Sequence, residues 1–495
     1  MQRRRKRPRI LICTPEITEL PEGMGNAAHT IRAKGGGLGD ISAGLIRYLH
    51  EDERFELHVV LPKYDAKFRD FANVTARELD LLVPLLQRKG VHLVSDSAFS
   101  NLHAVYEDSA AHPRVRRAEA FQRYIINQLL DELRPDVVHC NDWMTGLVPA
   151  AAREKRIKSI FTLHNVFTEY DSPSAIDRMG IDVRRFMAHL YMENFPEAYR
   201  DNWNGNRVDF TASGIHAADV VNTVSPTFLH EITRGEFQNI VPPSVRTAIR
   251  VKDENGRALG ILNAPSDTVD PRLAKHIVAY DETDVMEKKS QNKVLFQERM
   301  GLRQEAQAPI FLWPSRLYDQ KGPDLLFAIA KRIVDQHGAQ IAIVANGEPE
   351  MERKFQKLAL ASQGRISQRY FREDLSEIGK AGSDFVLMPS LYEPCGLPQM
   401  EGPRYGTLPV ARLTGGLSDT VLPLDLDNDT GIGFVFDEFS PEALEGAMLR
   451  AIEFHRLPFD TRRRVLERVM RESFDRFSLA VTAKQYIRVY ESFLE

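Results

Sequence analysis

Short β-prone runs alternate with helical stretches along almost the whole chain, and this alternation limits the possible folds more than any other feature. In the first half, the expected strands cover residues 9–13, 57–61, 102–106, 136–140, 159–163 and 220–224. A second series covers residues 310–314, 340–344, 365–370, 384–388 and 408–411. Strands separated by helices build parallel sheets from βαβ units. The pattern therefore predicts an α/β protein with doubly wound, Rossmann-like sheets.

The 495 residues of the chain are too many for one ordinary domain, because single domains usually hold roughly 100–200 residues. The strand pattern breaks near residues 262–271, where Pro265 and Pro271 disfavour helix in the residues before them. We therefore expect a first domain over residues 1–265 and a second over residues 266–475. A final segment, 476–495, has the spacing of an amphipathic helix.

The composition is that of an ordinary globular protein, with a net charge of −4 and three cysteines. This charge gives no reason to expect nucleic acid as a partner. No apolar run reaches the roughly 20 residues that cross a bilayer, so we expect no membrane association. The cysteines lie far apart and form no CxxC pair, which fits a reducing cytoplasm.

A glycine-rich segment, Lys34–Asp40, follows the first expected strand and precedes an expected helix over residues 41–49. Glycines such as Gly36 and Gly37 allow close approach of the backbone to a ligand, and amides at a helix N-terminus attract anions. Lys34 adds a positive charge. A tight structural turn is the simpler explanation, but the lysine and its position favour contact with a phosphate or diphosphate.

The segment from Glu393 to Glu401 follows the expected strand over residues 384–388, at the end of the strand where α/β proteins bind ligands. Pro398 fits the first turn of a helix, so Glu401 would lie one turn further on and could face the same ligand as Glu393. The free backbone amides of Gly396, Leu397 and Gln399, at the start of this helix, would then point toward anionic oxygens.

Other polar residues follow expected strands in both halves of the chain. Arg316 and Lys321 come after the strand over residues 310–314 and suit a departing diphosphate, whose negative charge they would stabilise. Asp142, His164 and Asn165 follow two strands of the first half and suit the hydroxyl groups of a sugar. His139 lies inside its expected strand, and we interpret it as structural.

A run of three aspartates, Asp425, Asp427 and Asp429, could indicate a metal site. An EF-hand loop needs glycine at its sixth position and glutamate at its twelfth, where this chain has Thr430 and Phe436. We therefore expect a solvated loop and no essential metal.

Taken together, these motifs resemble those of the bacterial glycogen synthases and plant starch synthases, which are retaining α-glucosyltransferases. The likeness covers nearly the whole chain and runs through residues 34–40, 61–64, 136–143, 161–165, 223–227, 315–322, 393–397, 405–409 and 414–421. It implies the glycosyltransferase-B fold, in which two Rossmann-like domains face a deep cleft. It also implies that the terminal helix crosses back to the first domain.

The resemblance implies a nucleotide-diphosphate glucose as donor, with ADP-glucose favoured over UDP-glucose, an α-1,4-glucan as acceptor, and no cofactor. It assigns catalytic roles to Glu393, His164, Arg316, Lys321 and Asp142, and substrate binding to Lys34, Gly36, Gly37, Asn165, Cys395, Gly396, Leu397, Glu401, Thr414, Gly415 and Gly416. The sequence leaves open whether retention uses front-face attack or a covalent intermediate. It does not define the oligomeric state.

The chain also departs from the usual family pattern. Met144 stands where a histidine is usual, and Glu401 where an aromatic residue is usual. In having a glutamate at this position, the chain resembles the sucrose- and trehalose-related transferases, in which this second glutamate binds the ribose hydroxyls. Two alternatives therefore remain: a UDP-glucose-dependent transferase with another sugar or a small molecule as acceptor, and a non-catalytic glucan-binding relative.

Overall fold

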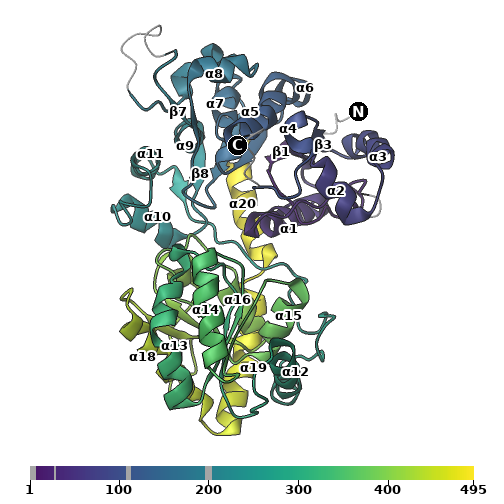
Figure 1. Cartoon of the computed structure of the whole chain (residues 1–495). Coiled ribbons are helices and arrows are strands. Elements are labelled where there is room, and N and C mark those ends of the chain that lie inside the picture. The colour runs from purple at the N-terminus through teal and green to yellow at the C-terminus, as the bar shows by residue number, and fades with distance from the viewer. Residues whose placement is uncertain (1–6, 27–28, 107–112, 195–202) are drawn as a thin grey trace. The chain divides into compact units, whose positions relative to one another are not determined.

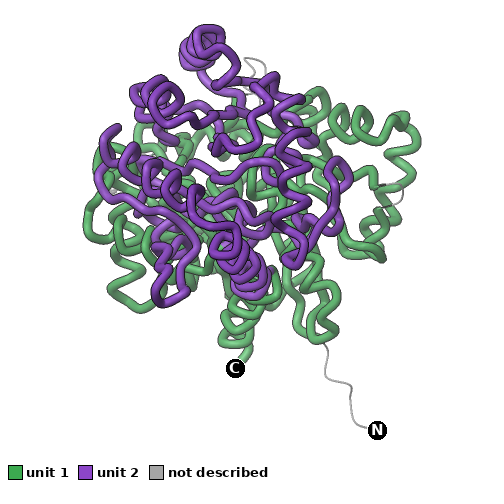
Figure 2. Tube along the Cα trace, turned by 90° about the horizontal axis from the view of Figure 1, so that it is seen from below, with its two compact units in different colours: residues 1–262, 479–495 green, residues 263–478 purple. Residues whose placement is uncertain are grey.

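The computed structural model describes residues 7–26, 29–106, 113–194 and 203–495 of the chain. These residues belong to two compact units. Unit 1 consists of residues 1–262 and 479–495, and unit 2 consists of residues 263–478. In Figure 2, the final segment has the colour of residues 1–262, although it follows unit 2 in the sequence.

The centre of unit 1 is a parallel sheet with the strand order β3-β2-β1-β4-β5-β8-β9. Its strands are β1 (Arg9–Cys13), β2 (Glu56–Pro62), β3 (Val91–Val94), β4 (Val137–Asn141), β5 (Lys158–Thr162), β8 (Val220–Asn222) and β9 (Ala258–Leu259). The short strands β6 (Tyr170–Asp171) and β7 (Val208–Asp209) pair separately and antiparallel. From β1, the next strands β2 and β3 are added toward one edge of the sheet, whereas β4 and the strands after it are added toward the other edge. The strand order therefore reverses between β1 and β4.

Helices cover this sheet (Figure 1). They are α1 (Gly37–Glu51), α2 (Asp65–Ala72), α3 (Ala76–Arg88), α4 (Ser97–Ser100), α5 (Arg114–Tyr124), α6 (Leu130–Leu133), α7 (Val148–Glu154), α8 (Pro173–Arg178), α9 (Phe210–Ala217), α10 (Pro226–Thr233), α11 (Pro243–Glu254) and α20 (Leu479–Leu494). Short 3₁₀ turns lie at Trp143–Thr145, Val183–Arg185 and Met187–His189.

The C-terminal helix α20 is part of the core of unit 1. Its Tyr490 hydroxyl lies 2.7 Å from Nδ1 of His139 in β4, and the Nε2 atom of that histidine lies 2.8 Å from the Thr162 hydroxyl in β5. The Tyr486 hydroxyl accepts a hydrogen bond of 2.7 Å from the Asn222 amide. Buried polar groups need such partners, so these bonds fix the position of the helix on the sheet. They also support a structural role for His139.

Unit 2 holds a second parallel sheet, with the order β12-β11-β10-β13-β14-β15. Its strands are β10 (Ile310–Trp313), β11 (Gln340–Val344), β12 (Ile366–Arg369), β13 (Phe385–Met388), β14 (Leu408–Arg412) and β15 (Phe434–Phe436). Its helices are α12 (Val285–Met300), α13 (Pro323–His337), α14 (Pro349–Ala361), α15 (Glu373–Gly382), α16 (Pro398–Arg404), α17 (Gly415–Thr420), α18 (Pro441–His455) and α19 (Phe459–Arg476). A 3₁₀ turn covers Asp319–Lys321. Here the strand order reverses between β10 and β13.

Two predictions about local structure were wrong. Residues 102–106 form turns, and the edge strand is β3, earlier in the chain. Leu102 and Val105 are buried because this loop packs against the domain, so their apolar character did not indicate a strand. The helix expected from residue 41 begins at Gly37, so this glycine and Gly39 lie inside the helix and not in the turn before it.

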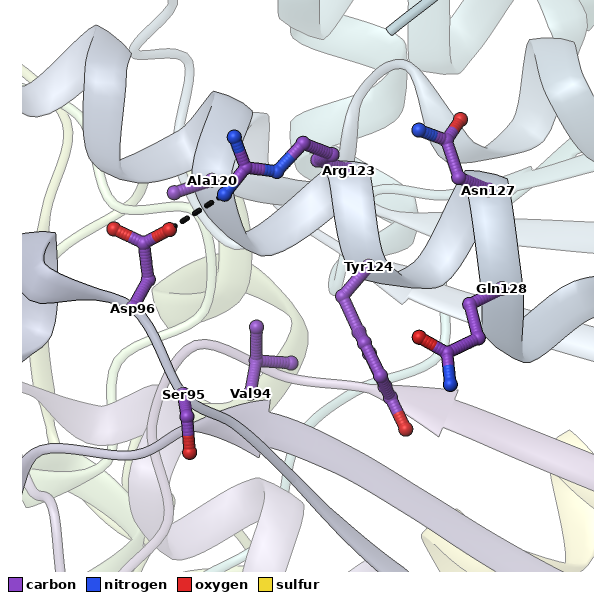
Figure 3. Close-up of a pocket in the computed structure, with 8 residues that line it drawn as sticks. All are labelled: Val94, Ser95, Asp96, Ala120, Arg123, Tyr124, Asn127 and Gln128. Carbon is purple, nitrogen blue, oxygen red and sulfur yellow. Dashed lines mark hydrogen bonds and ion pairs between the residues drawn. The ribbon is translucent and has the colours of Figure 1, made fainter. Parts of the chain in front are cut away.

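A π-helical turn, Ile125–Leu129, lies between α5 and α6. Such turns widen a helix locally and are frequent at functional sites. The turn lies beside a small cavity of about 270 Å³, which Figure 3 shows. Asn127, Gln128 and Tyr124 line the cavity, together with an ion pair of 2.7 Å between Asp96 and Arg123. None of the residues predicted from the sequence as a site lines it.

Among the described residues, no helix is both long enough and apolar enough to cross a membrane.

Candidate active site

In unit 2, the residues predicted to be catalytic lie on two loops at the carboxyl ends of β10 and β13, where the strand order reverses. Ligands of open α/β sheets bind at such a reversal. The backbone N–H of Leu391 donates to the carbonyl oxygen of Gln320 over 2.8 Å, and the Gln320 side chain donates to the Tyr392 carbonyl over 3.2 Å. Gly322 has a positive φ of 72°, and a Cβ atom there would lie 2.3 Å from the Pro389 carbonyl oxygen. The close approach of the two loops therefore requires glycine.

These loops bring Lys321 and Glu393 into contact. The Lys321 Nζ atom lies 2.5 Å from Oε2 of Glu393, and the Ser390 hydroxyl donates to the same oxygen over 2.9 Å. Glu393 is only 4% exposed, so its charge depends on these partners. Arg316, on the first loop, is exposed, and its guanidinium carbon lies 5.4 Å from the centre of the Tyr318 ring. Unit 2 therefore presents one carboxylate and two cations on adjacent loops.

The turn that contains Glu393 also packs against the start of α17. The Gly416 N–H donates to the Glu393 carbonyl over 2.9 Å, and a Cβ atom on this glycine would lie 2.2 Å from the Cys395 carbonyl oxygen. Thr414 is buried at the N-cap of α17, and Gly415 follows it with a φ of 44°. All three residues of the Thr414–Gly416 turn thus lie beside the glutamate turn. Burial raises the pKa of the Cys395 thiol to about 12, so this thiol is neutral.

Helix α16 begins at Pro398, which lies in its first turn as the sequence predicted, and Leu397 is its N-cap. Gly396 has a φ of 77°, which turns the chain into the helix. The Glu401 carboxylate, however, forms an ion pair of 2.8 Å with Lys380 of α15. A second function in ribose binding stays a prediction for Glu401, because the structure gives this carboxylate a partner within the protein.

In unit 1, the residues after β1 include an acidic side chain that the sequence reasoning missed. Glu16 is 1% exposed, and its Oε2 atom accepts hydrogen bonds from the backbone N–H groups of Gly35, over 2.5 Å, and Gly36, over 2.7 Å. The Tyr106 hydroxyl donates to the other oxygen over 2.9 Å. Burial raises the pKa of Glu16, whereas the two amides lower it. The position at the carboxyl end of β1, where the strand order reverses, was the signal that could have identified this residue.

Glu16 changes the interpretation of the glycine segment. The glycine segment was expected to contact a phosphate, but a carboxylate of the protein already binds the amides of Gly35 and Gly36. Lys34 lies 2.8 Å from Asp40 and is partly exposed. Phosphate contact therefore stays a prediction for Lys34 and for the start of α1, where Gly37 is the first residue.

Asp142 and the His164–Asn165 pair meet at the carboxyl ends of β4 and β5. The Asp142 carboxylate accepts hydrogen bonds from the His164 N–H, over 2.7 Å, and from the Asn165 side-chain amide, over 3.0 Å. Asp142 is 3% exposed, and burial raises its pKa to about 7. Its φ of 55° is rare for a residue other than glycine. Backbone strain of this kind is common at functional sites.

The protonation of His164 follows from its neighbours. Burial lowers its pKa to about 3, so the ring is neutral near pH 7. The Asn141 amide nitrogen donates to the Cys13 carbonyl over 3.0 Å, which leaves the Asn141 oxygen to accept from His164 Nε2 over 3.0 Å. Nε2 therefore carries the ring proton, and Nδ1 holds a free lone pair.

The aspartate run does not gather around one point. Asp425 accepts hydrogen bonds from Asp427 and Asn428 within its own loop, and Asp429 pairs with Arg468 over 3.3 Å. In the part of the chain that the structure describes, no group of three or more His, Cys, Asp or Glu side chains could hold a metal ion.

Changing Glu16 to glutamine tests its contact with the glycine segment. If the amide oxygen takes the place of Oε2, the bonds from Gly35 and Gly36 become weaker because the acceptor loses its negative charge. In the other orientation, the amide N–H groups would face these two backbone donors. We expect a loss of about 1–3 kcal/mol in the free energy of unfolding and at least a tenfold loss in kcat/KM. Chemical denaturation and initial rates measure these effects. The matched control is Glu19→Gln, on the same loop, where the partly exposed carboxylate pairs with Arg47. Equal effects of the two substitutions would contradict the assignment.

Comparison with known proteins identifies the family. Residues 9–241 match the model of the starch synthase catalytic domain, and residues 297–467 match that of glycosyl transferases group 1. The chain is 31% identical to the glycogen synthase of Pectobacterium atrosepticum, with 84% of this chain and 88% of that protein covered. It is 32% identical to the glycogen synthase of Cellvibrio japonicus, with 92% and 96% covered.

The chain belongs to the glycogen synthase and starch synthase family. Its fold is similar to that of the catalytic domain of starch synthase IV from Arabidopsis thaliana, which was solved with ADP and acarbose bound. The TM-score is 0.78, the identity is 25%, and 99% of each chain is covered. These likenesses confirm the predicted fold class, two α/β domains of the glycosyltransferase-B type, and the predicted enzyme class, a hexosyltransferase.

Proposed function

We propose that this family member transfers glucose from a nucleotide-diphosphate glucose to the non-reducing end of an α-1,4-glucan. The observation that carries the proposal is the contact of Lys321 with Glu393 on two bonded loops where the sheet of unit 2 reverses its strand order. The names of the relatives, glycogen synthase and starch synthase, support the substrate classes.

Arg316 and Lys321 stabilise the leaving group. Breaking the anomeric bond places negative charge on the diphosphate, and cations at this point lower the energy of the transition state. The Lys321 ammonium has three donors, so it can keep its contact with Glu393 and still donate to a phosphate oxygen.

Glu393 stabilises the reacting sugar. The anomeric carbon gains positive, oxocarbenium-like character as the bond to the diphosphate breaks, and a buried carboxylate favours such charge. In unit 1, Asp142, His164 and Asn165 are already bonded to one another and provide acceptors and donors for sugar hydroxyls. A neutral His164 suits this role because hydroxyl groups carry no charge to balance.

ADP-glucose is the proposed donor, and UDP-glucose is the alternative. The departure of Glu401 from the usual family pattern favours the alternative, whereas its ion pair with Lys380 leaves it less available to a ribose. Incubation of the purified protein with each labelled donor and glycogen tests the choice. We expect at least a tenfold higher kcat/KM with ADP-glucose, and an increase in chain length after debranching.

Faster transfer from UDP-glucose would reverse the donor assignment. Transfer to a small sugar, without elongation of glycogen, would replace the acceptor. Binding of both donors with neither transfer nor hydrolysis would refute catalysis. We place the reaction in the cytoplasm, and the three cysteines, Cys13, Cys140 and Cys395, are all free and buried, as a reducing compartment allows.

A further inference from the structure

Unit 2 contains a second concave region, at the opposite end of β13 from Glu393. Glu393 follows the carboxyl end of this strand, whereas Asp384 directly precedes its first residue, Phe385. Asp384 lines a cavity of about 290 Å³ between α12, α18 and α19. The cavity is close to the smallest pockets that bind small molecules. None of the predicted active-site residues lines it.

Cationic side chains outnumber acidic ones around this cavity. Lys289, Lys293 and Arg462 line it, and Asp384 is its only carboxylate among the described lining residues. Asp384 is already bound by Lys293 over 2.9 Å, by His455 over 3.5 Å and by the Ile310 N–H over 2.8 Å. These partners lower the pKa of Asp384, so the carboxylate is ionised and its negative charge is already balanced within the protein. The field inside the cavity is therefore positive.

Lys289 offers a ligand in the cavity its positive charge more than its hydrogen bonds, because its donors already have acceptors within the protein. Its ammonium donates to the Ala381 and Tyr405 carbonyls, each over 3.1 Å, and to the Thr407 hydroxyl over 2.6 Å. Burial lowers its pKa to about 7. An anion in the cavity would favour the charged form of this amine, since opposite charges stabilise each other.

Arg462 also lines this cavity. Its Nε atom is buried and has no hydrogen-bond partner among the described residues, and its guanidinium forms no ion pair there. The next residues of α19 differ, since Arg463 pairs with Asp460 and Glu467 and Arg464 lies 3.8 Å from Asp429. A buried donor without a partner costs free energy, so its presence calls for a ligand or another explanation.

We propose that this cavity binds the phosphate group of a small phosphorylated metabolite. Arginine forms paired hydrogen bonds with phosphate oxygens, and Arg462 offers such a group beside Lys293. The exposed amide of Gln307 adds a donor at the rim. Phe459 is 46% exposed and also lines the cavity, so the ring of a sugar or base attached to the phosphate can pack against it. This site does not depend on the proposed function.

Isothermal titration of the whole chain with inorganic phosphate, glucose 1-phosphate and AMP tests the proposal. Lys321→Gln serves as the background, because it removes a cation of the candidate active site. We expect one site that prefers at least one of the two esters to inorganic phosphate. Adding Arg462→Gln should weaken binding at least tenfold. Adding Phe459→Ser should reduce the affinity for the ester to the affinity for inorganic phosphate.

The matched control is Arg463→Gln, one residue further along the same helix, which should change the affinity less than twofold. Gln307→Ala, at an exposed position, provides a second test if Arg462→Gln alters the circular dichroism spectrum, and it should weaken binding about threefold or more. No binding of any probe to the Lys321→Gln protein would overturn the proposal. Equal effects of Arg462→Gln and Arg463→Gln would also overturn it, and equal affinity for phosphate and both esters would refute the ring contact. Loss of glucosyl transfer in Lys321→Gln tests the proposed function separately.

Discussion

Changing Glu393 to glutamine is expected to reduce glucosyl transfer about 10²–10³-fold while the protein stays folded. The amide keeps the size of the side chain and can still accept from the Ser390 hydroxyl, but it removes the negative charge beside the reacting sugar. Lys321 is 16% exposed, so its ammonium keeps some access to water after the change. Initial rates with each donor and glycogen measure the effect, and the loss should fall on kcat more than on KM.

The double variant distinguishes a shared role from two independent ones. Lys321→Gln alone should also reduce transfer at least a hundredfold, and combining it with Glu393→Gln should cost much less than the product of the two, because both residues act on one bond-breaking step. Lys331→Ala is the matched control, since this exposed lysine of α13 pairs only with Asp335 among the described residues. Unchanged turnover in Glu393→Gln, with normal circular dichroism, would remove the assignment.

Changing His139 to glutamine is expected to make the protein more resistant to acid. Burial lowers the pKa of this histidine to about 3, whereas in the unfolded chain it is near about 6.5. As the pH falls below the unfolded value, the unfolded chain binds a proton that the folded protein excludes. Folding then loses about 1.4 kcal/mol per pH unit down to the folded value. A glutamine cannot bind this proton, so the variant should avoid the loss.

The measurement is the difference in unfolding free energy between wild type and His139→Gln, from urea titrations at steps between pH 7 and pH 4. At pH 7 the wild type should be more stable, because it keeps its bonds to Tyr490 and Thr162. The difference should shrink by about 1.4 kcal/mol per pH unit on acidification. Only the difference is informative, since other buried groups also titrate.

Asp142 should change the stability of the protein with pH in the opposite direction to His139. Its pKa is raised to about 7, so the folded protein holds a proton that the unfolded chain releases above about pH 4. Relative to Asp142→Asn, the wild type should lose stability as the pH rises toward 7 and then show no further change. Parallel curves for wild type and either variant would show that the group is not buried as the structure has it.

The local parts of the fold could be read from the sequence because they depend on short-range patterns. Most of the predicted strands lie within one or two residues of the observed ones, and Pro398 opens α16 as predicted. Residues 102–106, which form turns, are the exception. Leu102 and Val105 are apolar because tertiary packing buries their loop, and an apolar pattern does not report which backbone conformation buries it.

The candidate site was predictable where a residue type and a strand end coincided. Arg316, Lys321 and Glu393 each follow a strand, and the sequence alone suggested that they act together. The roles of Gly35 and Gly36 were not predictable from the sequence. Their amides bind Glu16, about 20 residues earlier, and this contact depends on the path of the loop between them. The pairing of Glu401 with Lys380 has the same origin, since the two residues lie on separate helices.

The sequence by itself determined the fold class, the family and the residue types available for the chemistry, because these follow from periodicity and from motifs within a few residues. Only the tertiary structure decided which of those groups already have partners. It placed Glu16 in the glycine turn and buried Asp142 and His164 so that their pKa values shift in opposite directions. It also left the Arg462 Nε atom, in the cavity that Asp384 lines, without a partner among the described residues. The physical reason is that burial and hydrogen bonding between distant residues exist only after the chain has folded.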